Sequence, residues 1–218
     1  MKIKEWIKNH KALWALVLPL YLASFFAVER VVTEESAWTS TILPIDDFIP
    51  FFEWAIFAYM LWFPLLVVTG LYLLFTNGKA FRRYMLFMAI GFMASVVICL
   101  VFPNGTGLDF RPDLETLGRS NIATFLCSAI YSADTCTNVI PSIHVVGAIM
   151  VLGGFYDSNL SGKKWLAALE WILNVLVIVS TVLVKQHAFI DVVAGLVLGI
   201  VDYIIVYVIV KRKDKQKE

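Results

Sequence analysis

Charged residues are scarce in this chain. Only 16% of its 218 residues are Asp, Glu, Lys or Arg, whereas 60% are hydrophobic. Soluble domains carry about 25% charged residues. The charges are also bunched between long apolar runs instead of being spread along helical faces, which is typical of a chain whose solvent is lipid. No basic patch is interleaved with aromatic residues, so nothing in the sequence suggests a nucleic-acid partner.

Cysteine and histidine are also rare, with three of each. Cys99 lies in an apolar run, whereas Cys127 and Cys136 share one loop, where they could form a disulfide in an oxidising space or remain unpaired. No pair or triplet has the spacing of zinc ligands. The histidines are far apart in the sequence: His10, His144 and His187. We therefore expect neither a metal nor another cofactor.

Six apolar segments dominate the sequence, at about 12–28, 54–76, 84–102, 141–156, 165–184 and 188–210. Most reach the roughly 20 residues that a helix needs to cross about 30 Å of hydrocarbon. The fourth is shorter, so it must tilt little or thin the membrane locally. The sequence therefore predicts an all-α polytopic membrane protein, a bundle of six transmembrane helices in a single domain over residues 1–218.

The first apolar segment follows a basic stretch, as in a signal peptide. No Ala-x-Ala cleavage site closes it, however, and Glu29 and Arg30 follow directly. We interpret it as an uncleaved first span.

Lys and Arg residues alternate between the two sides that six spans would create. Fourteen fall in one set of loops and in the tail from Lys211 to Lys217, whereas the alternate loops hold only four: Arg30, Arg111, Arg119 and Lys185. By the positive-inside rule the first set is cytoplasmic, together with the N and C termini. The outward loops are then 29–53, 103–140 and the short turn at 185–187.

Polar residues gather at the outward ends of these segments. In the run 141–144, Ser142 or Asn138 can cap the fourth helix, and the free N–H groups of its first turn favour an anion such as phosphate. His144 lies in that first turn. Taken alone, such a histidine is more often a polar interface residue than a catalyst.

The pair His187 and Asp191 lies at the start of the sixth segment. Residues four apart share a helical face, so the carboxylate can orient the ring and make its other nitrogen a better base or nucleophile. A purely structural pair that closes a helix end is an equally open interpretation. Arg111, followed by Pro112, offers a planar fork for phosphate oxygens, although a single loop arginine is usually only solvated. Together these outward groups are what phosphoryl transfer requires.

In these motifs the chain resembles the type 2 phosphatidic acid phosphatase superfamily of membrane lipid phosphatases, most closely a bacterial branch related to sphingolipid head-group transferases. That family has Lys, six residues and Arg-Pro, then Pro-Ser-x-His, then Ser-Arg, five residues, His, three residues and Asp. The corresponding residues here are Arg111-Pro112, the run 141–144, and Ser180 with His187 and Asp191. The resemblance spans roughly residues 85–210, the motif-bearing core, and fits a six-span topology.

Two family cations are missing at their usual positions. The first lysine of the pattern falls on Asn104, which we keep as a candidate phosphate ligand, and the arginine after Ser180 is Thr181. Lys185 and Arg119 are candidates to compensate.

The resemblance implies that His187 attacks the phosphorus, Asp191 orients its ring and His144 protonates the departing oxygen. The phosphoryl oxygens would be held by a shared set of groups: Arg111, Ser142, Ile143, Lys185 and Asn104. The expected activity is metal-independent hydrolysis of a lipid phosphate or diphosphate, namely phosphatidic acid, phosphatidylglycerol phosphate or undecaprenyl diphosphate. A head-group phosphotransferase and a catalytically silent membrane protein or transporter are the alternatives. The expected location is the bacterial plasma membrane, with the site outside the cytoplasm; the sequence does not indicate an oligomeric state.

Polar residues also occur within the spans. Glu170 and Asn174 are four apart on the fifth span, and Asp202 lies on the sixth. We expect the two carboxylates near the cytoplasmic third, paired with Asn174 or with lysines, although a proton or substrate pathway is an alternative.

Overall fold

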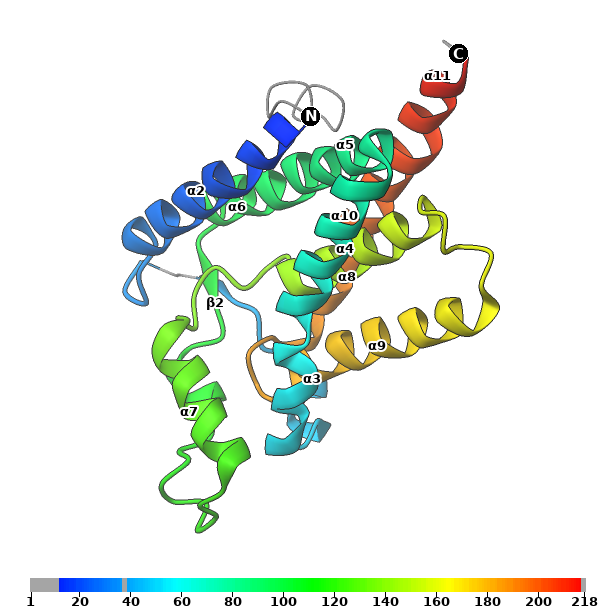
Figure 1. The fold of residues 1–218 in the computed structure, drawn as a ribbon. Helices are drawn as coiled ribbons and strands as arrows, with labels where there is room; N and C mark the ends of the chain where they lie inside the picture. Colours follow the sequence, from blue (N-terminus) through cyan, green and yellow to red (C-terminus); the bar gives the residue numbers. More distant parts are fainter. Residues whose placement is uncertain (1–11, 37–38, 217–218) are drawn as a thin grey trace.

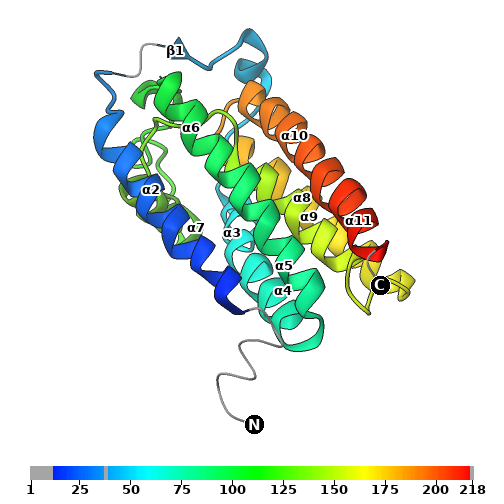
Figure 2. The ribbon, with the colours of Figure 1, turned by 90° about the horizontal axis from the view of Figure 1, so that it is seen from above.

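In the computed structural model, which describes residues 12–36 and 39–216, the chain folds into a bundle of helices (Figure 1). The main helices are α2 (Val17–Val31), α4 (Trp62–Thr76), α5 (Gly78–Phe87), α6 (Met93–Val101), α8 (Ile143–Tyr156), α9 (Lys164–Leu183) and α10 (Phe189–Tyr203). The other helices are η1 (Ala12–Leu16), α3 (Ile56–Met60), α7 (Ile122–Ala133) and α11 (Lys211–Lys215). Single turns are η2 (Pro44–Phe48), η3 (Glu53–Ala55) and η5 (Leu108–Phe110). Figure 2 shows the long helices lying side by side.

Two helical segments are π-helical: η4 (Met88–Phe92), which joins α5 to α6, and η6 (Ile204–Val210), which joins α10 to α11. The only sheet among the described residues is a two-residue parallel pairing of β1 (Thr39–Ser40) with β2 (Asn104–Gly105), with Thr39 opposite Asn104. This pairing ties the first outward loop to the second.

Five helical stretches are long and apolar enough to cross a membrane: Leu13–Val31, Glu53–Thr76, Gly78–Val101, Lys164–Leu183 and Phe189–Asp214. They correspond to five of the six predicted spans. The predicted fourth span is α8, which has 14 residues and so extends only about 21 Å. Eleven of those residues are buried, because α4, α9 and α10 pack around it. The short segment is thus the centre of the bundle.

Two glycines let neighbouring helices approach α8 closely. A Cβ at Gly195 of α10 would lie 2.8 Å from the carbonyl oxygen of Ser142, and one at Gly147 would lie 2.5 Å from Trp62 Nε1. Real Cβ atoms do not come this near, so only glycine fits at these positions. The first contact brings the middle of α10 against the residue that precedes α8.

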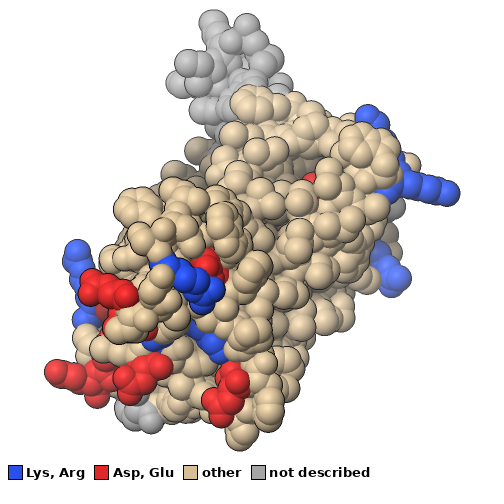
Figure 3. Space-filling view, turned by 90° about the horizontal axis from the view of Figure 1, so that it is seen from below, with Lys and Arg blue, Asp and Glu red and all other residues tan. Residues whose placement is uncertain are grey.

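Charged groups join the helix ends at one end of the bundle. Arg83 of α5 binds Asp157, at the end of α8, at 2.6 Å and Asp214 at 2.7 Å, and Lys211 binds Asp157 at 2.7 Å. Arg82 also pairs with Asp214. In Figure 3 charged side chains gather toward opposite ends of the molecule and leave a broad, largely uncharged belt between them. The N-terminal lysines used to orient the chain, at positions 2–11, lie outside the described residues.

The loop 103–140 contains α7, which the sequence analysis did not predict. Asn121 begins this helix, because its side chain accepts hydrogen bonds from the backbone of Ala123 and Thr124. Cys127 and Cys136, the possible disulfide pair, are both free thiols and buried.

Within the spans, Asn174 Nδ2 donates to Glu170 Oε2 at 3.4 Å, as the shared face predicted. Asp202 is fully buried against Gly91 of η4. It forms no ion pair with any residue of the described chain, so the predicted pairing with a lysine is not found there.

Candidate functional site

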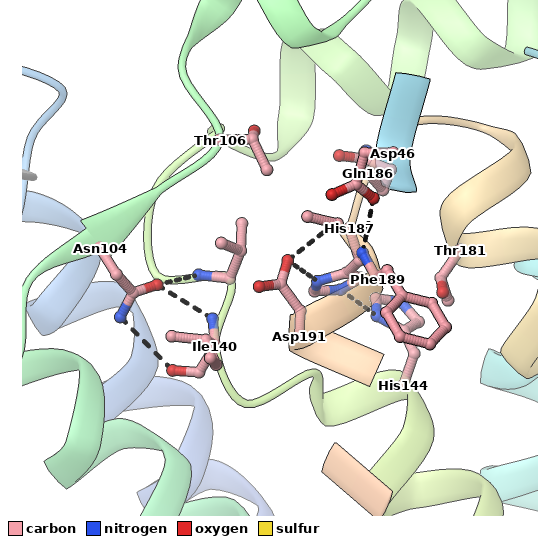
Figure 4. A network of polar contacts seen from close by, with 12 residues as sticks. Asp46, Asn104, Thr106, Ile140, His144, Thr181, Gln186, His187, Phe189 and Asp191 are labelled. Atoms are coloured by element: carbon pink, nitrogen blue, oxygen red, sulfur yellow. Dashed lines mark hydrogen bonds and ion pairs between the residues drawn. The ribbon is translucent and has the colours of Figure 1, made fainter. Parts of the chain in front are cut away.

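Two histidines meet at the end of the bundle opposite the Arg83 and Asp157 cluster. His144 is the second residue of α8, and His187 lies in the turn between α9 and α10. The Nδ1 atom of His144 is 3.3 Å from the Nε2 atom of His187 (Figure 4). Both side chains are buried, at 4% and 6% exposed. The two imidazoles are therefore close enough to act on a single phosphoryl group.

Asp191 lies behind His187, on the side away from His144. Its Oδ2 atom is 3.4 Å from His187 Nδ1 and also accepts a hydrogen bond of 2.8 Å from the backbone N–H of Ala188 (Figure 4). As the third residue of α10, Asp191 caps the helix, and its charge is favourable near the helix N-terminus. The same oxygen thus closes the helix end and lies next to the His187 ring; the role of orienting that ring stays a prediction.

The turn that carries His187 is fixed by the end of α9. The carbonyl oxygen of Thr181 accepts hydrogen bonds from the backbone N–H groups of Gln186, at 3.0 Å, and His187, at 3.1 Å. Lys185, which precedes Gln186, adopts a left-handed conformation with φ of 52°. Thr181, at the position of the family arginine, is fully buried. Its backbone therefore positions the turn that carries His187, while its side chain lies away from solvent.

The start of α8 presents donors next to the two rings. The first N–H groups of a helix have no acceptor within the helix, and its dipole favours an anion there. The backbone N–H of Ser142 donates to the carbonyl oxygen of Asp191 at 3.1 Å, which holds α8 against α10. The Ser142 hydroxyl is buried and has no hydrogen-bond partner in residues 12–36 or 39–216. This unpaired hydroxyl beside His144 is a ready donor to a bound oxyanion.

Arg111 connects the loop 103–140 to the turn that carries His187. Its guanidinium donates to the carbonyl oxygens of Tyr131 (3.3 Å), Asp134 (2.9 Å) and Thr135 (2.7 Å), and to the side-chain oxygen of Gln186. Arg111 therefore contacts the residue that immediately precedes His187, the candidate nucleophile.

The two cations that are candidates to compensate, Lys185 and Arg119, make other contacts in this structure. Lys185 Nζ donates to the carbonyl oxygen of Asp46 at 3.0 Å and lies 4.9 Å from the centre of the Phe110 ring. Burial lowers the pKa of Lys185, while the charges of Asp46 and Asp47 oppose that change. Arg119 pairs with Glu53 at 3.1 Å.

Asn104 is fully buried and supports the loop before α8. Its Oδ1 atom accepts hydrogen bonds of 3.0 Å from the backbone N–H groups of Val139 and Ile140, and its Nδ2 donates to the Phe102 carbonyl oxygen at 2.7 Å (Figure 4). The amide at the position of the family lysine thus holds the loop segment that leads to Ser142. A role as a phosphate ligand stays a prediction.

Asp46 is a site residue that the sequence analysis did not single out. Its side chain is buried, with Oδ1 accepting from the backbone N–H of Phe189 at 2.7 Å and Oδ2 from that of Leu43 at 2.8 Å. Turn η2 is thereby fastened over the start of α10. The acidic, aromatic-rich first loop was the available signal, but nothing in it indicated which carboxylate turns inward.

Aromatic rings pack on the other side of His144. The centres of the Tyr59 and Trp62 rings lie 4.4 Å and 4.5 Å from the centre of the imidazole. These rings fix the imidazole in place. No group of three or more His, Cys, Asp or Glu residues within the described ranges is arranged to hold a metal ion.

Comparison with known proteins adds one match. A family model described as "PAP2 superfamily" matches residues 84–215, which hold His144, His187, Asp191 and Arg111. No individual curated protein matches the chain.

Proposed function

The chain belongs to the PAP2 superfamily, and on this premise we propose that it is an integral-membrane lipid phosphatase that acts through a phosphohistidine. Membership by itself suggests a lipid phosphatase or a related phosphotransferase. The observation that carries the proposal is a chain of two contacts: His144 Nδ1 lies 3.3 Å from His187 Nε2, and His187 Nδ1 lies 3.4 Å from Asp191 Oδ2.

In the first step His187 Nε2 attacks the phosphorus. An N–P bond forms, the bond from phosphorus to the lipid oxygen breaks, and His144 gives its proton to that oxygen. The His187 ring becomes positively charged, and Asp191 stabilises this charge from the Nδ1 side. In the second step His144 takes a proton from water, the water oxygen attacks the phosphorus, and inorganic phosphate leaves His187.

Donors around the rings would hold the phosphoryl oxygens. The proposed set is the backbone N–H of Ile143, the Ser142 hydroxyl, and the cations Arg111 and Lys185; the Ser142 N–H stays on the Asp191 carbonyl oxygen. For Arg111 this requires exchange of its Gln186 contact for a phosphate oxygen. Fixed cations and dipoles of this kind stabilise developing negative charge without a metal ion.

The proposed substrate is a lipid phosphate or diphosphate: phosphatidic acid, phosphatidylglycerol phosphate or undecaprenyl diphosphate. The proposed location is the bacterial plasma membrane, with the site on the extracytoplasmic side. Its support is the separation of the histidines from the end of the bundle that carries Arg82, Arg83 and Lys211. If an alcohol replaced water in the second step, the same intermediate would make the chain a head-group phosphotransferase.

Phosphate release from a panel of these lipids, in detergent micelles, tests the proposal. We expect release by the wild type, none by His187→Ala or His144→Ala, and no effect of a chelator. In His144→Ala, acid-labile phosphate on His187 should appear when an activated leaving group removes the need for a proton donor. Near-normal release by either alanine variant contradicts the mechanism, and turnover only with an added alcohol identifies the transferase.

A further inference from the structure

A deep apolar groove leads away from His144 along the bundle. It has a volume of about 530 Å³ and lies between α2 on one side and α3 and α4 on the other, with α5 and η4 as its floor. Figure 1 shows the helices that contribute its lining residues, among them α2, α4 and α5. Its outer end is formed by His144, Ile143 and the end of α7, including Asp134. The groove is therefore continuous with the candidate active site.

The walls of the groove are regular helical stripes. On α3 and α4, residues at spacings of three and four line it from Tyr59 to Leu74, and on α2 the lining runs from Ala15 to Phe26. At 1.5 Å per residue these stripes are about 22 Å and about 16 Å long. Half of a hydrocarbon core of about 30 Å is about 15 Å, so the groove is longer than one leaflet is thick.

The ionisable acid and imidazole groups of the groove lie at one end only. Asp134 and His144 line its outer end, and from there inward the lining is aliphatic, aromatic or glycine. A lipid phosphate is arranged in the same way, with a polar phosphate at one end and an apolar chain behind it. Its phosphate must reach His144 and His187, and its chain continues from the leaving oxygen. The position of His144 between His187 and the groove puts the leaving oxygen on the groove side.

We propose that this groove binds one hydrocarbon chain of the substrate lipid, extended along the bundle, and so selects substrates with a long chain. The inference rests on the proposed function, since the chain is the one attached to the phosphate that the histidines attack. Both walls come from α2, α3 and α4, which precede the family match at 84–215. Chain selection is thereby built by residues outside the shared core.

Tryptophan substitutions on the groove wall test this inference. Val67 lines the groove and is 56% exposed, whereas its neighbour Val68 is 64% exposed and lies outside the groove. Val67→Trp fills the groove, and Val68→Trp is the matched control on the same helix. Leu22→Trp against Leu20→Trp repeats the comparison on α2, where Leu22 lines the groove and Leu20 does not. All four positions are exposed, so the core does not have to change.

Each variant is assayed for phosphate release from lysophosphatidic acid with an oleoyl or a hexanoyl chain, in mixed micelles. A misplacement of about 1 Å can cost about 100-fold in rate, so a chain forced out of the groove should lower kcat/KM for the oleoyl substrate at least about tenfold in Val67→Trp and Leu22→Trp. The hexanoyl substrate and both control variants should stay within about twofold of wild type.

Two results overturn the inference in different ways. In the first, the wild type is active, but Val67→Trp and Val68→Trp have the same kcat/KM for the oleoyl substrate, or each loses activity equally on both substrates. Either outcome excludes the substrate chain as the occupant and indicates a structural lipid or a second protein helix. A wild type that releases no phosphate from either lysolipid, nor from phosphatidic acid, phosphatidylglycerol phosphate or undecaprenyl diphosphate, overturns the proposed function itself.

Discussion

The Nδ1 atom of His144 and the Nε2 atom of His187 lie 3.3 Å apart, although the residues are 43 positions apart in the sequence. His144 lies in the first turn of α8, and His187 lies just before α10. The two helices meet because Gly195 leaves room for the Ser142 carbonyl group and because the Ser142 N–H donates to the Asp191 carbonyl oxygen. One backbone contact thus sets both the helix packing and the spacing of the reactive rings.

Asp191→Asn should separate the orienting role of the carboxylate from its capping role. Asparagine can still accept the hydrogen bond from the Ala188 N–H, so we expect little change in Tm. It cannot stabilise a positive charge on His187, and kcat should fall at least about 100-fold. Phosphate release and thermal unfolding of the same preparation check both. An unchanged kcat would leave Asp191 with the capping role alone.

Arg111→Lys should weaken substrate binding because a lysine lacks the planar fork that matches phosphate oxygens. Hydrogen bonds to charged groups contribute about 1.5–3 kcal/mol, so kcat/KM should fall about tenfold to 100-fold. Arg119→Lys is the matched control, because Arg119 pairs with Glu53.

Arg111 also binds carbonyl groups at the end of α7, so a loss of activity could follow from a loosened loop. Gln186→Ala removes only the contact between Arg111 and the turn that carries His187. If its Tm and kcat/KM stay close to wild type while Arg111→Lys loses activity at unchanged Tm, the guanidinium acts on the substrate. Equal losses of Tm and activity in Arg111→Lys would instead assign it a structural role.

Asn104→Ala should reduce stability before it affects phosphate binding. It removes the acceptor of the Val139 and Ile140 N–H groups, and buried donors left unpaired cost about 2 kcal/mol or more in total. We expect a lower Tm in detergent. At a temperature where the variant is folded, KM should stay within about twofold of wild type. A large rise in KM with an unchanged Tm would support the phosphate-ligand prediction instead.

Asp134→Asn should stabilise the protein in a pH-dependent way. Burial raises the pKa of Asp134 above its usual 3.8, although His187 and Arg111 oppose that rise. A carboxyl with a raised pKa favours folding while it is protonated, and this contribution is lost as the pH rises through the raised value. The neutral asparagine avoids that loss. The Tm difference between variant and wild type should therefore be small near the usual pKa and increase toward neutral pH; a difference that does not depend on pH would contradict the assignment.

The apolar runs carried most of the fold prediction. Five of the six predicted spans are helices of sufficient length, because a backbone in lipid must satisfy its hydrogen bonds within its own segment. The fourth, α8, is short because other helices cover it instead of lipid. Helix α7 was missed since its signal, the Asn121 cap, is local and stands in a long polar loop. The family resemblance, carried by the motifs around Arg111, His144 and His187, is confirmed by the match at residues 84–215.

The sequence by itself determined the membrane class, the family and the identity of the candidate catalytic residues, since hydropathy and motif spacing are local properties of the chain. Only the tertiary structure decided which side chains meet. In the folded chain Asp46 accepts a hydrogen bond from the start of α10, and Asn104 accepts hydrogen bonds from the backbone before α8. A groove lies between α2 and α4 beside His144. Such contacts depend on the packing of distant helices, and no spacing within a single segment encodes them.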